Sequence, residues 1–228
     1  MDSPVVVIGG SGRLGRLVVS RLLDLGERVR VVGRGAPGEA LPAGVPYTAA
    51  DVREPGSLDA PLADCSALVY CVSPGTDDTG PDRPETTMYL GVRHALRSAV
   101  RTGRRPHVVL VSQIHATHYG HPLNAYGKVL DWRRAGEDEV RESGLSHTVV
   151  RPGWLVDDQR AGSRVRLVQG DRATGQVSRQ HAAEACIQAM YCPSAIGVTF
   201  ELFNETGPAV TDWESSFAAL DWDRIPVG

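Results

Sequence analysis

The stretch "VVVIGGSGRLGRLV", residues 5–18, joins a short apolar run to a helical pattern through three glycines spaced three apart. The unbroken apolar run predicts a strand buried on both faces of a parallel sheet. Gly9 permits a tight turn, Gly12 lets backbone N–H groups approach a pyrophosphate, and Gly15 lets the helix pack against the strand. The stretch therefore predicts a dinucleotide-binding loop that opens a βαβ unit, and a merely tight strand–helix turn is the alternative.

The same alternation of strand and helix patterns continues along the chain. Strand patterns occur at 28–34, 45–51, 67–73, 107–112 and 147–153, and helix patterns at 13–26, 57–65, 86–103 and 130–144. This order predicts an α/β protein with right-handed βαβ units and a doubly wound parallel sheet.

Two segments are expected to lie beside the site. Beyond residue 153 the pattern loosens into strands at 164–170 and 198–205 and a helix at 178–192. We expect one domain, residues 1–228, in which the part from about 153 adds a small substrate-side cap. The Pro/Gly-rich stretch 73–87 follows a strand end and is expected to form a lip over the site.

Composition restricts the class of protein. A net charge of −3 argues against nucleic acid as an obligate partner. No apolar run approaches ~20 residues, and the N-terminus has no basic region, so we expect neither a membrane span nor a signal peptide. The four cysteines form no C-x-x-C pair, which favours a reduced cytoplasmic protein.

The end of the second predicted strand indicates which nucleotide is bound. Sites for NAD carry an acidic residue there, whereas this strand ends in Gly33 and Arg34. Arg13 lies within the glycine loop, and two guanidinium groups suit a 2′-phosphate, so we predict NADP(H) rather than NAD(H). The alternative is that both arginines are solvated. Asp51, at the end of the third strand, is expected either to bind the adenine amino group or to cap the next helix.

Several segments together resemble a known family. "GGSGRLG", "ESGLSHTVVRPGWLVDD" and "VSRQHAAEACIQAM" are similar to those of atypical short-chain dehydrogenase/reductases, within the NAD(P)H-binding group close to NmrA-like proteins and biliverdin-IXβ (flavin) reductases. The resemblance covers residues 4 to about 205. It implies a Rossmann fold, a bound dinucleotide and, in catalytic members, a Ser/Tyr/Lys set. The residues expected to contact the cofactor are Gly9, Ser11, Gly12, Arg13, Leu14, Gly15, Arg34, Asp51, Val52, Cys71, Val72, Ser73, Lys128 and Pro152.

The Ser/Tyr/Lys set is incomplete in this chain. Ser112 matches the family serine that ends the fifth strand. Tyr126 and Lys128, the only lysine, are two positions apart instead of four, which is about 200° of rotation on a helix. Three readings stay open: a non-helical turn brings both side chains to the site, Arg133 replaces the family lysine at the nicotinamide ribose, or Tyr126 packs and Lys128 is solvated.

Three histidines follow Ser112 at equal spacing. "SQIHATHYGH" places His115, His118 and His121 three apart, in a segment expected to lie over the nicotinamide. One of them, His115 first, is a candidate proton donor in place of tyrosine. The alternative is a set of polar loop residues that touch substrate or solvent. No carboxylate lies nearby in sequence and the segment does not read as a regular helix, so we expect no metal site.

These observations favour one function and leave two alternatives. We expect an NADP(H)-dependent oxidoreductase that acts on a small carbonyl, quinone-like or flavin-like molecule, as a monomer or homodimer. The broken Tyr/Lys spacing keeps open a non-redox isomerase, dehydratase or cyclase on the same fold. It also keeps open an NmrA-like sensor that binds a dinucleotide without catalysis.

Overall fold

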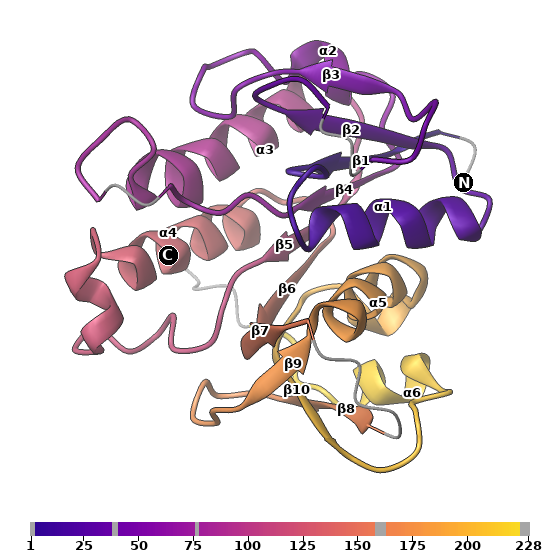
Figure 1. The fold of residues 1–228 in the computed structure, drawn as a ribbon, viewed down its shortest axis with the longest axis vertical. Helices are drawn as coiled ribbons and strands as arrows, with labels where there is room; N and C mark the ends of the chain where they lie inside the picture. The colour runs from indigo at the N-terminus through magenta and orange to yellow at the C-terminus, as the bar shows by residue number, and fades with distance from the viewer. Residues whose placement is uncertain (1–2, 38–40, 76–77, 158–162, 224–228) are drawn as a thin grey trace.

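The chain alternates strands and helices through most of its length, as Figure 1 shows for the described residues 3–37, 41–75, 78–157 and 163–223 of the computed structural model. In chain order the elements are β1 (Val5–Ile8), α1 (Gly15–Asp24), β2 (Val29–Gly33), β3 (Tyr47–Ala49), α2 (Asp59–Leu62), β4 (Ala67–Tyr70), the π-helix η1 (Glu85–Leu90), α3 (Gly91–Arg101), β5 (His107–Val111), the 3-10 helix η2 (Pro122–Ala125), α4 (Val129–Glu142), β6 (His147–Pro152), β7 (Trp154–Val156), β8 (Ser163–Val168), β9 (Gln176–Ser178), α5 (Arg179–Tyr191), the 3-10 helix η3 (Pro193–Ala195), β10 (Val198–Thr206) and α6 (Trp213–Ala218).

The central sheet has eight strands in the order β3-β2-β1-β4-β5-β6-β10-β8. All neighbouring pairs are parallel except β10 and β8, which are antiparallel. This arrangement confirms the predicted doubly wound parallel sheet. The strand order reverses direction between β1 and β4, and folds of this kind bind ligands at the carboxyl ends of the strands at such a point.

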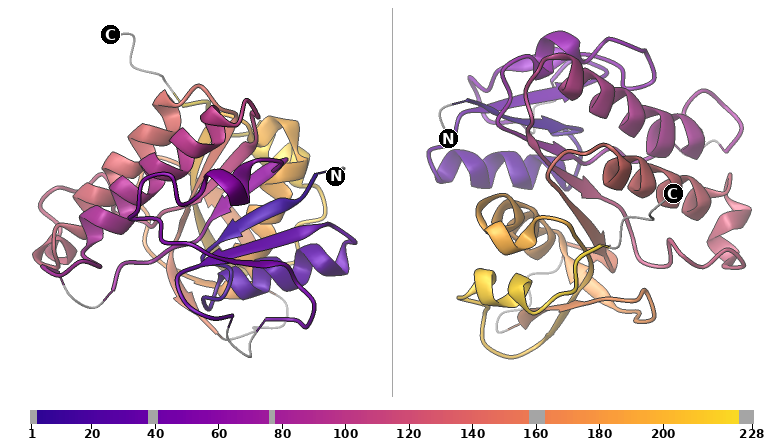
Figure 2. Two further views of the ribbon diagram at one scale, coloured as in Figure 1. Left: turned by 90° about the horizontal axis from the view of Figure 1, so that it is seen from above. Right: turned by 180° about the vertical axis from the view of Figure 1, so that it is seen from behind.

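Helices cover both faces of the sheet, so β1 is buried on both sides. Val5 and Val7 pack in one apolar core with residues of α1, α5 and α6, whereas Val6 and Ile8 pack in a second core with residues of α2, α3 and α4. Figures 1 and 2 show these two helical layers on opposite sides of the strands. The burial explains why the first strand is an unbroken apolar run.

The segment after residue 153 contributes more to the fold than a cap. Residues 198–203 of β10 are all buried, and this strand joins the sheet beside β6, with Phe200 opposite Val150. The short strands β7 and β9 pair with each other in a separate two-stranded sheet. The expected strands and helix of this region are present as β8, β10 and α5, but both strands extend the main sheet. Among the described residues after 153, Leu155 of β7 and Arg179 of α5 border the site.

Two expectations from composition concern cysteines and membranes. All four cysteines are free thiols. No helix within the described ranges is both long enough and apolar enough to cross a bilayer.

A buried group of ion pairs fastens α4 to the sheet. Both oxygens of Glu137, which is fully buried, accept hydrogen bonds from the Arg151 guanidinium of β6, at 2.9 and 2.6 Å. Arg141 donates to the same carboxylate at 3.0 Å, and Arg151 also donates to Glu201 at 3.1 Å. Burial raises the pKa of Glu137, but the two guanidinium groups outweigh it and hold that pKa below its ordinary value. The carboxylate of Glu137 is therefore ionised, and both of its oxygens are occupied by hydrogen bonds from Arg151 and Arg141.

Removing Arg151 should destabilise the fold strongly. Arg151→Met leaves Glu137 and Glu201 buried without their main counter-charge, and we expect a loss of about 3–5 kcal/mol in the free energy of unfolding. Urea unfolding measures it. The control is Arg101→Met, which removes an exposed pair with Asp59 and should change the free energy of unfolding little, because solvent screens such a pair. Equal small losses in both variants would contradict this account of α4.

Candidate functional site

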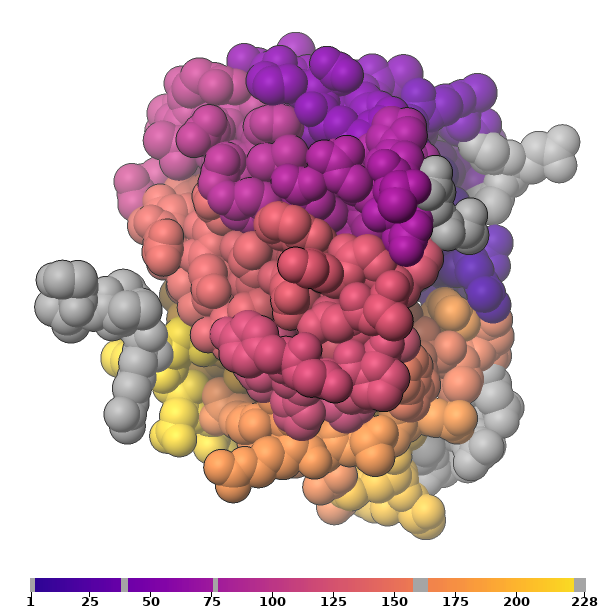
Figure 3. Space-filling model, turned by 90° about the vertical axis from the view of Figure 1, so that its left-hand side faces the viewer, coloured from indigo at the N-terminus to yellow at the C-terminus, as the bar shows by residue number. Residues whose placement is uncertain are grey.

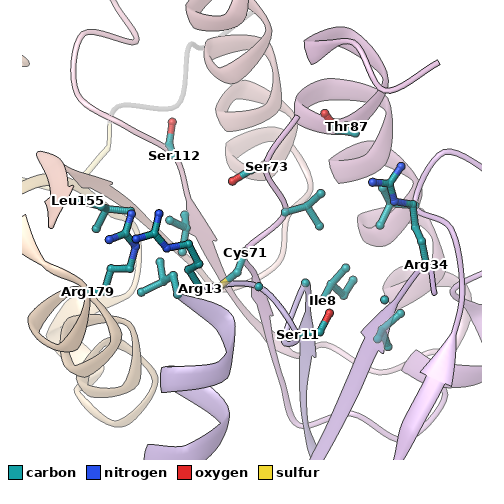
Figure 4. Close-up of a pocket in the computed structure, with 18 of the residues that line it drawn as sticks. Ile8, Ser11, Arg13, Arg34, Cys71, Ser73, Thr87, Ser112, Leu155 and Arg179 are labelled. Atoms are coloured by element: carbon teal, nitrogen blue, oxygen red, sulfur yellow. The ribbon is translucent and has the colours of Figure 1, made fainter. Parts of the chain in front are cut away.

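A cavity of about 450 Å³ lies at the carboxyl ends of β1, β2, β4 and β5. Figure 4 shows the side chains that surround it. Its lining includes ten residues expected to contact a cofactor: Gly9, Ser11, Gly12, Arg13, Leu14, Arg34, Val52, Cys71, Val72 and Ser73. Ser112 and Arg133 also line it, together with Leu155 of β7 and Arg179 of α5. The cavity thus connects the glycine loop with the end of β5.

The glycine loop has the geometry that its sequence predicts. Gly9 has φ +81°, and a Cβ there would lie 2.9 Å from the carbonyl oxygen of Cys71. A Cβ on Gly15 would lie 2.2 Å from the carbonyl oxygen of Gly9, so this glycine permits contact between α1 and the turn and does not line the cavity. The residues just before α1 border the cavity and direct the N-terminus of this helix to it.

Two arginines share one carboxylate at one end of the cavity. Arg34 donates to Oδ1 of Asp82 at 2.6 Å, and Arg53 contacts the same oxygen. Arg53 also binds Asp51, whose Oδ1 accepts both the backbone N–H and Nε of Arg53 at 2.9 Å. These hydrogen bonds lower the pKa of Asp51. Asp51 does not line the cavity, although Ala50 and Val52 do. It does not cap the next helix either, because α2 begins at Asp59 with Leu58 as its N-cap residue.

Arg13 lies at the other end, away from Arg34. It pairs with Asp157, which also accepts a hydrogen bond from Arg179 at 2.6 Å. Figure 4 shows Arg13 and Arg179 side by side and Arg34 on the opposite side of the cavity. The structure therefore does not bring Arg13 and Arg34 together, because the turn directs Arg13 toward β7 and α5.

Two buried polar atoms without hydrogen-bond partners, Oγ of Ser112 and Nε of Arg133, belong to residues that line the cavity near the end of β5. The hydroxyl oxygen of Ser112 is buried and makes no hydrogen bond of normal geometry, although it lies close enough to the Glu137 carboxylate to help lower the pKa of that group. Nε of Arg133 is also buried without a partner, and Nη1 donates only a long bond of 3.4 Å to the Val111 carbonyl. Burial lowers the pKa of Arg133 to about 10. Arg133, the residue aligned with the family lysine, is the one that reaches the cavity.

Tyr126 and Lys128 do not line this cavity. The turn before α4 is non-helical, with φ values of +50° at Gly127 and +55° at Lys128, and the helix begins at Val129. The Tyr126 hydroxyl donates to the carbonyl of Gly75 in the loop after β4, and Lys128 is exposed. The predicted turn thus exists, but it brings neither side chain to the cavity. Pro152 is buried in β6 and does not line the cavity either.

The three histidines gather around a carboxylate that is distant in sequence. Oδ1 of Asp171 accepts the backbone N–H of His115 at 2.6 Å, and Oδ2 accepts that of Thr117 at 2.8 Å. His115 stacks on His121 with ring centroids 4.6 Å apart, and burial lowers the pKa of His115. Figure 3 shows this segment and α4, in pink and salmon, across the middle of one face of the molecule.

This histidine cluster has the spacing of a small metal site, and Nδ1 of His115 is buried without a hydrogen-bond partner, but the carboxylate is already occupied. One ligand atom from each of His115, His118 and Asp171 lies within 4.8 Å of the others. Both oxygens of Asp171 already accept hydrogen bonds from the backbone, and a ring nitrogen of His118 lies 2.6 Å from the Asp171 carbonyl. None of the three histidines lines the cavity. Asp171 therefore serves to shape the loop after β5.

The residues around the cavity fit a dinucleotide. The close approaches at Gly9 and Gly15 leave the turn free of side chains where a pyrophosphate would lie. A pair of arginines is available at one end and an unpartnered hydroxyl at the other. Sequence reasoning missed Arg53, Asp82 and Asp171. Only Arg53 had a local signal, because it lies two residues after the end of a predicted strand.

Comparison with known proteins agrees with this geometry. The chain is 25% identical over 262 residues to sanguinarine reductase of Eschscholzia californica, covering 95% of each protein, and 25% identical over 225 residues to NAD(P)H azoreductase of Xenophilus azovorans, covering 95% of this chain and 72% of that one. Among solved structures, a putative NAD-dependent epimerase/dehydratase from Bacillus halodurans superposes with a TM-score of 0.79 at 24% identity, covering 90% of this chain and 96% of that one. The profile of the NAD(P)H-binding family matches residues 9–193, and the chain belongs to this family of Rossmann-fold proteins.

Proposed function

We propose that the chain is an NADPH-dependent reductase of a small carbonyl, quinone-like or flavin-like molecule. The observation that carries the proposal is the buried, unpartnered hydroxyl of Ser112 at the opposite end of the cavity from Arg34. If the glycine loop holds the pyrophosphate, the nicotinamide lies at the Ser112 end. A hydroxyl there is free to donate a hydrogen bond to the oxygen of a substrate beside the ring.

The residues of the cavity have distinct roles in this proposal. Backbone N–H groups of the glycine loop and the N-terminus of α1 bind the pyrophosphate. When bound, the reduced dinucleotide supplies the hydride. Ser112 orients the substrate oxygen, and Leu155 of β7 shields the reacting atoms from water.

The preference for NADPH rests on the arginine pair. No acidic residue ends β2, and Arg34 and Arg53 already hold one carboxylate oxygen between them. A 2′-phosphate carries more negative charge than the carboxylate of Asp82 and suits two guanidinium groups. In this proposal Asp82 therefore occupies the phosphate position until the cofactor enters.

The two relatives support reduction in particular, because both bear the names of reductases. One observation favours a second function: among the described lining residues there is neither a tyrosine nor a lysine, which suits a dinucleotide-binding sensor. For the reductase we also propose a small-molecule substrate, a cytoplasmic location and a monomeric or homodimeric state.

The arginine pair should decide between the two nucleotides. We expect NADPH to bind more tightly than NADH, and Arg34→Ala or Arg53→Ala to weaken NADPH binding about tenfold to a hundredfold while NADH binding changes little. Asp82→Asn should strengthen NADPH binding, because it removes the competing charge. Calorimetric titration measures these affinities, with Arg101→Ala as the control outside the cavity. Tighter binding of NADH by the unaltered chain would contradict the preference.

Ser112 should be needed for turnover and not for nucleotide binding. We expect NADPH oxidation with at least one acceptor from a panel of quinones, flavins and carbonyls, and Ser112→Ala should lower kcat about 10- to 100-fold with little change in NADPH affinity. Ser143→Ala is the matched control, since its hydroxyl donates to the Val140 carbonyl within α4. NADPH binding without oxidation by any acceptor would favour the sensor.

Lys128 should be dispensable. Its side chain is exposed and lies outside the cavity lining, so Lys128→Met is expected to keep the NADPH affinity and kcat of the unaltered chain. Steady-state kinetics across a range of NADPH concentrations measures both. A loss of turnover as large as that of Ser112→Ala would show that Lys128 reaches the substrate.

A further inference from the structure

Arg133 differs from the other arginines around the cavity in its counter-charge. Arg34 pairs with Asp82, and Arg13 and Arg179 both pair with Asp157. Arg133 has no ion pair with any residue in the described part of the chain. Its guanidinium therefore keeps most of its five N–H donors uncommitted.

The carboxylate of Glu137 does not form an ion pair with Arg133, because its oxygens already accept hydrogen bonds from other arginines. Glu137 lies four residues further along α4, one turn away, which is the usual distance for an ion pair on a helix. Its two oxygens instead accept hydrogen bonds from Arg151 and Arg141. Burying a guanidinium whose Nε has no hydrogen-bond partner is costly, and burial lowers the pKa of Arg133 although the charge of Glu137 acts in the opposite direction. The arrangement favours any ligand that brings a negative charge to this point.

The cavity also lacks a group that could protonate a strong base. Its described lining contains no histidine, tyrosine, lysine or carboxylic acid. Burial raises the pKa of the Cys71 thiol well above its ordinary value, which makes this thiol a poor acid. The Tyr126 hydroxyl, the usual donor in such a site, donates to Gly75 instead. An oxygen that becomes negative here must remain stable as an anion.

We infer that Arg133, together with Ser112, binds an oxyanion formed on the substrate, and that the substrate is a conjugated carbonyl compound of the quinone type. This inference rests on the proposed reductase function. The C4–H bond of the reduced nicotinamide breaks, and its electron pair forms a C–H bond at a carbon conjugated to the carbonyl. The π electrons shift onto the carbonyl oxygen, and Arg133 holds the resulting enolate. The product leaves the site as this anion and takes its proton from bulk solvent.

The chemistry of the anion explains why simple carbonyls are excluded. A phenol ionises near a pKa of ~10, so the enolate or phenolate from a quinone persists beside a guanidinium. An alkoxide from an aldehyde is about as basic as hydroxide, since bulk water has a pKa of ~15.7. It needs a proton donor in the site, and the described lining offers none.

The test compares two acceptors and three variants of the full chain. With NADPH, we expect 1,4-naphthoquinone to be reduced and benzaldehyde to be reduced far more slowly. Arg133→Met should lower kcat with naphthoquinone by about 10²–10³-fold, as for the loss of an oxyanion donor. Arg133→Lys, which keeps the charge, should recover part of the rate, and Arg101→Met should behave as the unaltered chain. NADPH affinity and thermal melting confirm that each variant is folded.

A second readout does not depend on turnover. The complex with NADP⁺ is titrated with 4-nitrophenol, whose ionised form is coloured. The unaltered chain should bind the phenolate and lower the apparent pKa of the nitrophenol, and Arg133→Met should abolish this shift. No shift in the unaltered chain, or equal reduction of benzaldehyde, would overturn the assignment of Arg133. Failure of every acceptor to oxidise NADPH would instead contradict the proposed reductase function.

Discussion

The carboxylate of Glu137 determines how the site is built. It is fully buried and accepts hydrogen bonds from Arg151 of β6 and from Arg141 of its own helix. These bonds fix α4 against the sheet and so set the position of Arg133 one turn earlier on the helix. Because the oxygens of this carboxylate already accept hydrogen bonds from other arginines, Arg133 reaches the cavity without an ion pair to any residue that the structure describes. Stability of the helix and reactivity of the site thus depend on one group.

The charge distribution in the cavity likewise depends on which arginines form ion pairs with carboxylates. At each end a carboxylate joins two guanidinium groups, Asp82 at one end and Asp157 at the other. Each of these carboxylates neutralises only one of its two guanidinium groups, so the Asp157 cluster keeps a positive charge before a ligand arrives. At the other end Asp51 balances the second charge by pairing with Arg53. Phosphate groups can replace the carboxylates because they carry more negative charge. Among the arginines that line the cavity, Arg133 is the one without an ion pair to a described residue, so a negative charge that develops in a reaction is stabilised best there.

Much of the fold could be predicted from the sequence, because its signals are local. The glycine loop, the apolar strands and the helix from residue 130 depend on neighbours a few positions apart. Ser112 and Arg133 were found because strand ends and a family alignment locate them. The three-residue strands β7 and β9 were missed because they are too short to show a period.

The remaining features depend on contacts between residues far apart in the chain. The direction of Arg13 is set by Asp157, 144 residues later. The histidine loop is shaped by Asp171, 56 residues after His115. The spacing of Tyr126 and Lys128 showed that the usual pair was broken, but not that Tyr126 binds the loop after β4. Local sequence patterns do not predict such contacts, because they form only when distant segments pack together in the folded protein.

A crystal structure of the complex with NADP⁺ tests the central claim most directly, because it locates both ends of the cofactor at once. The account predicts the pyrophosphate on the glycine loop, the 2′-phosphate between Arg34 and Arg53 with Asp82 displaced, and the nicotinamide beside Ser112 and Arg133. A nicotinamide that lies away from Ser112, or a 2′-phosphate bound by Arg13 and Arg179 instead, would contradict it.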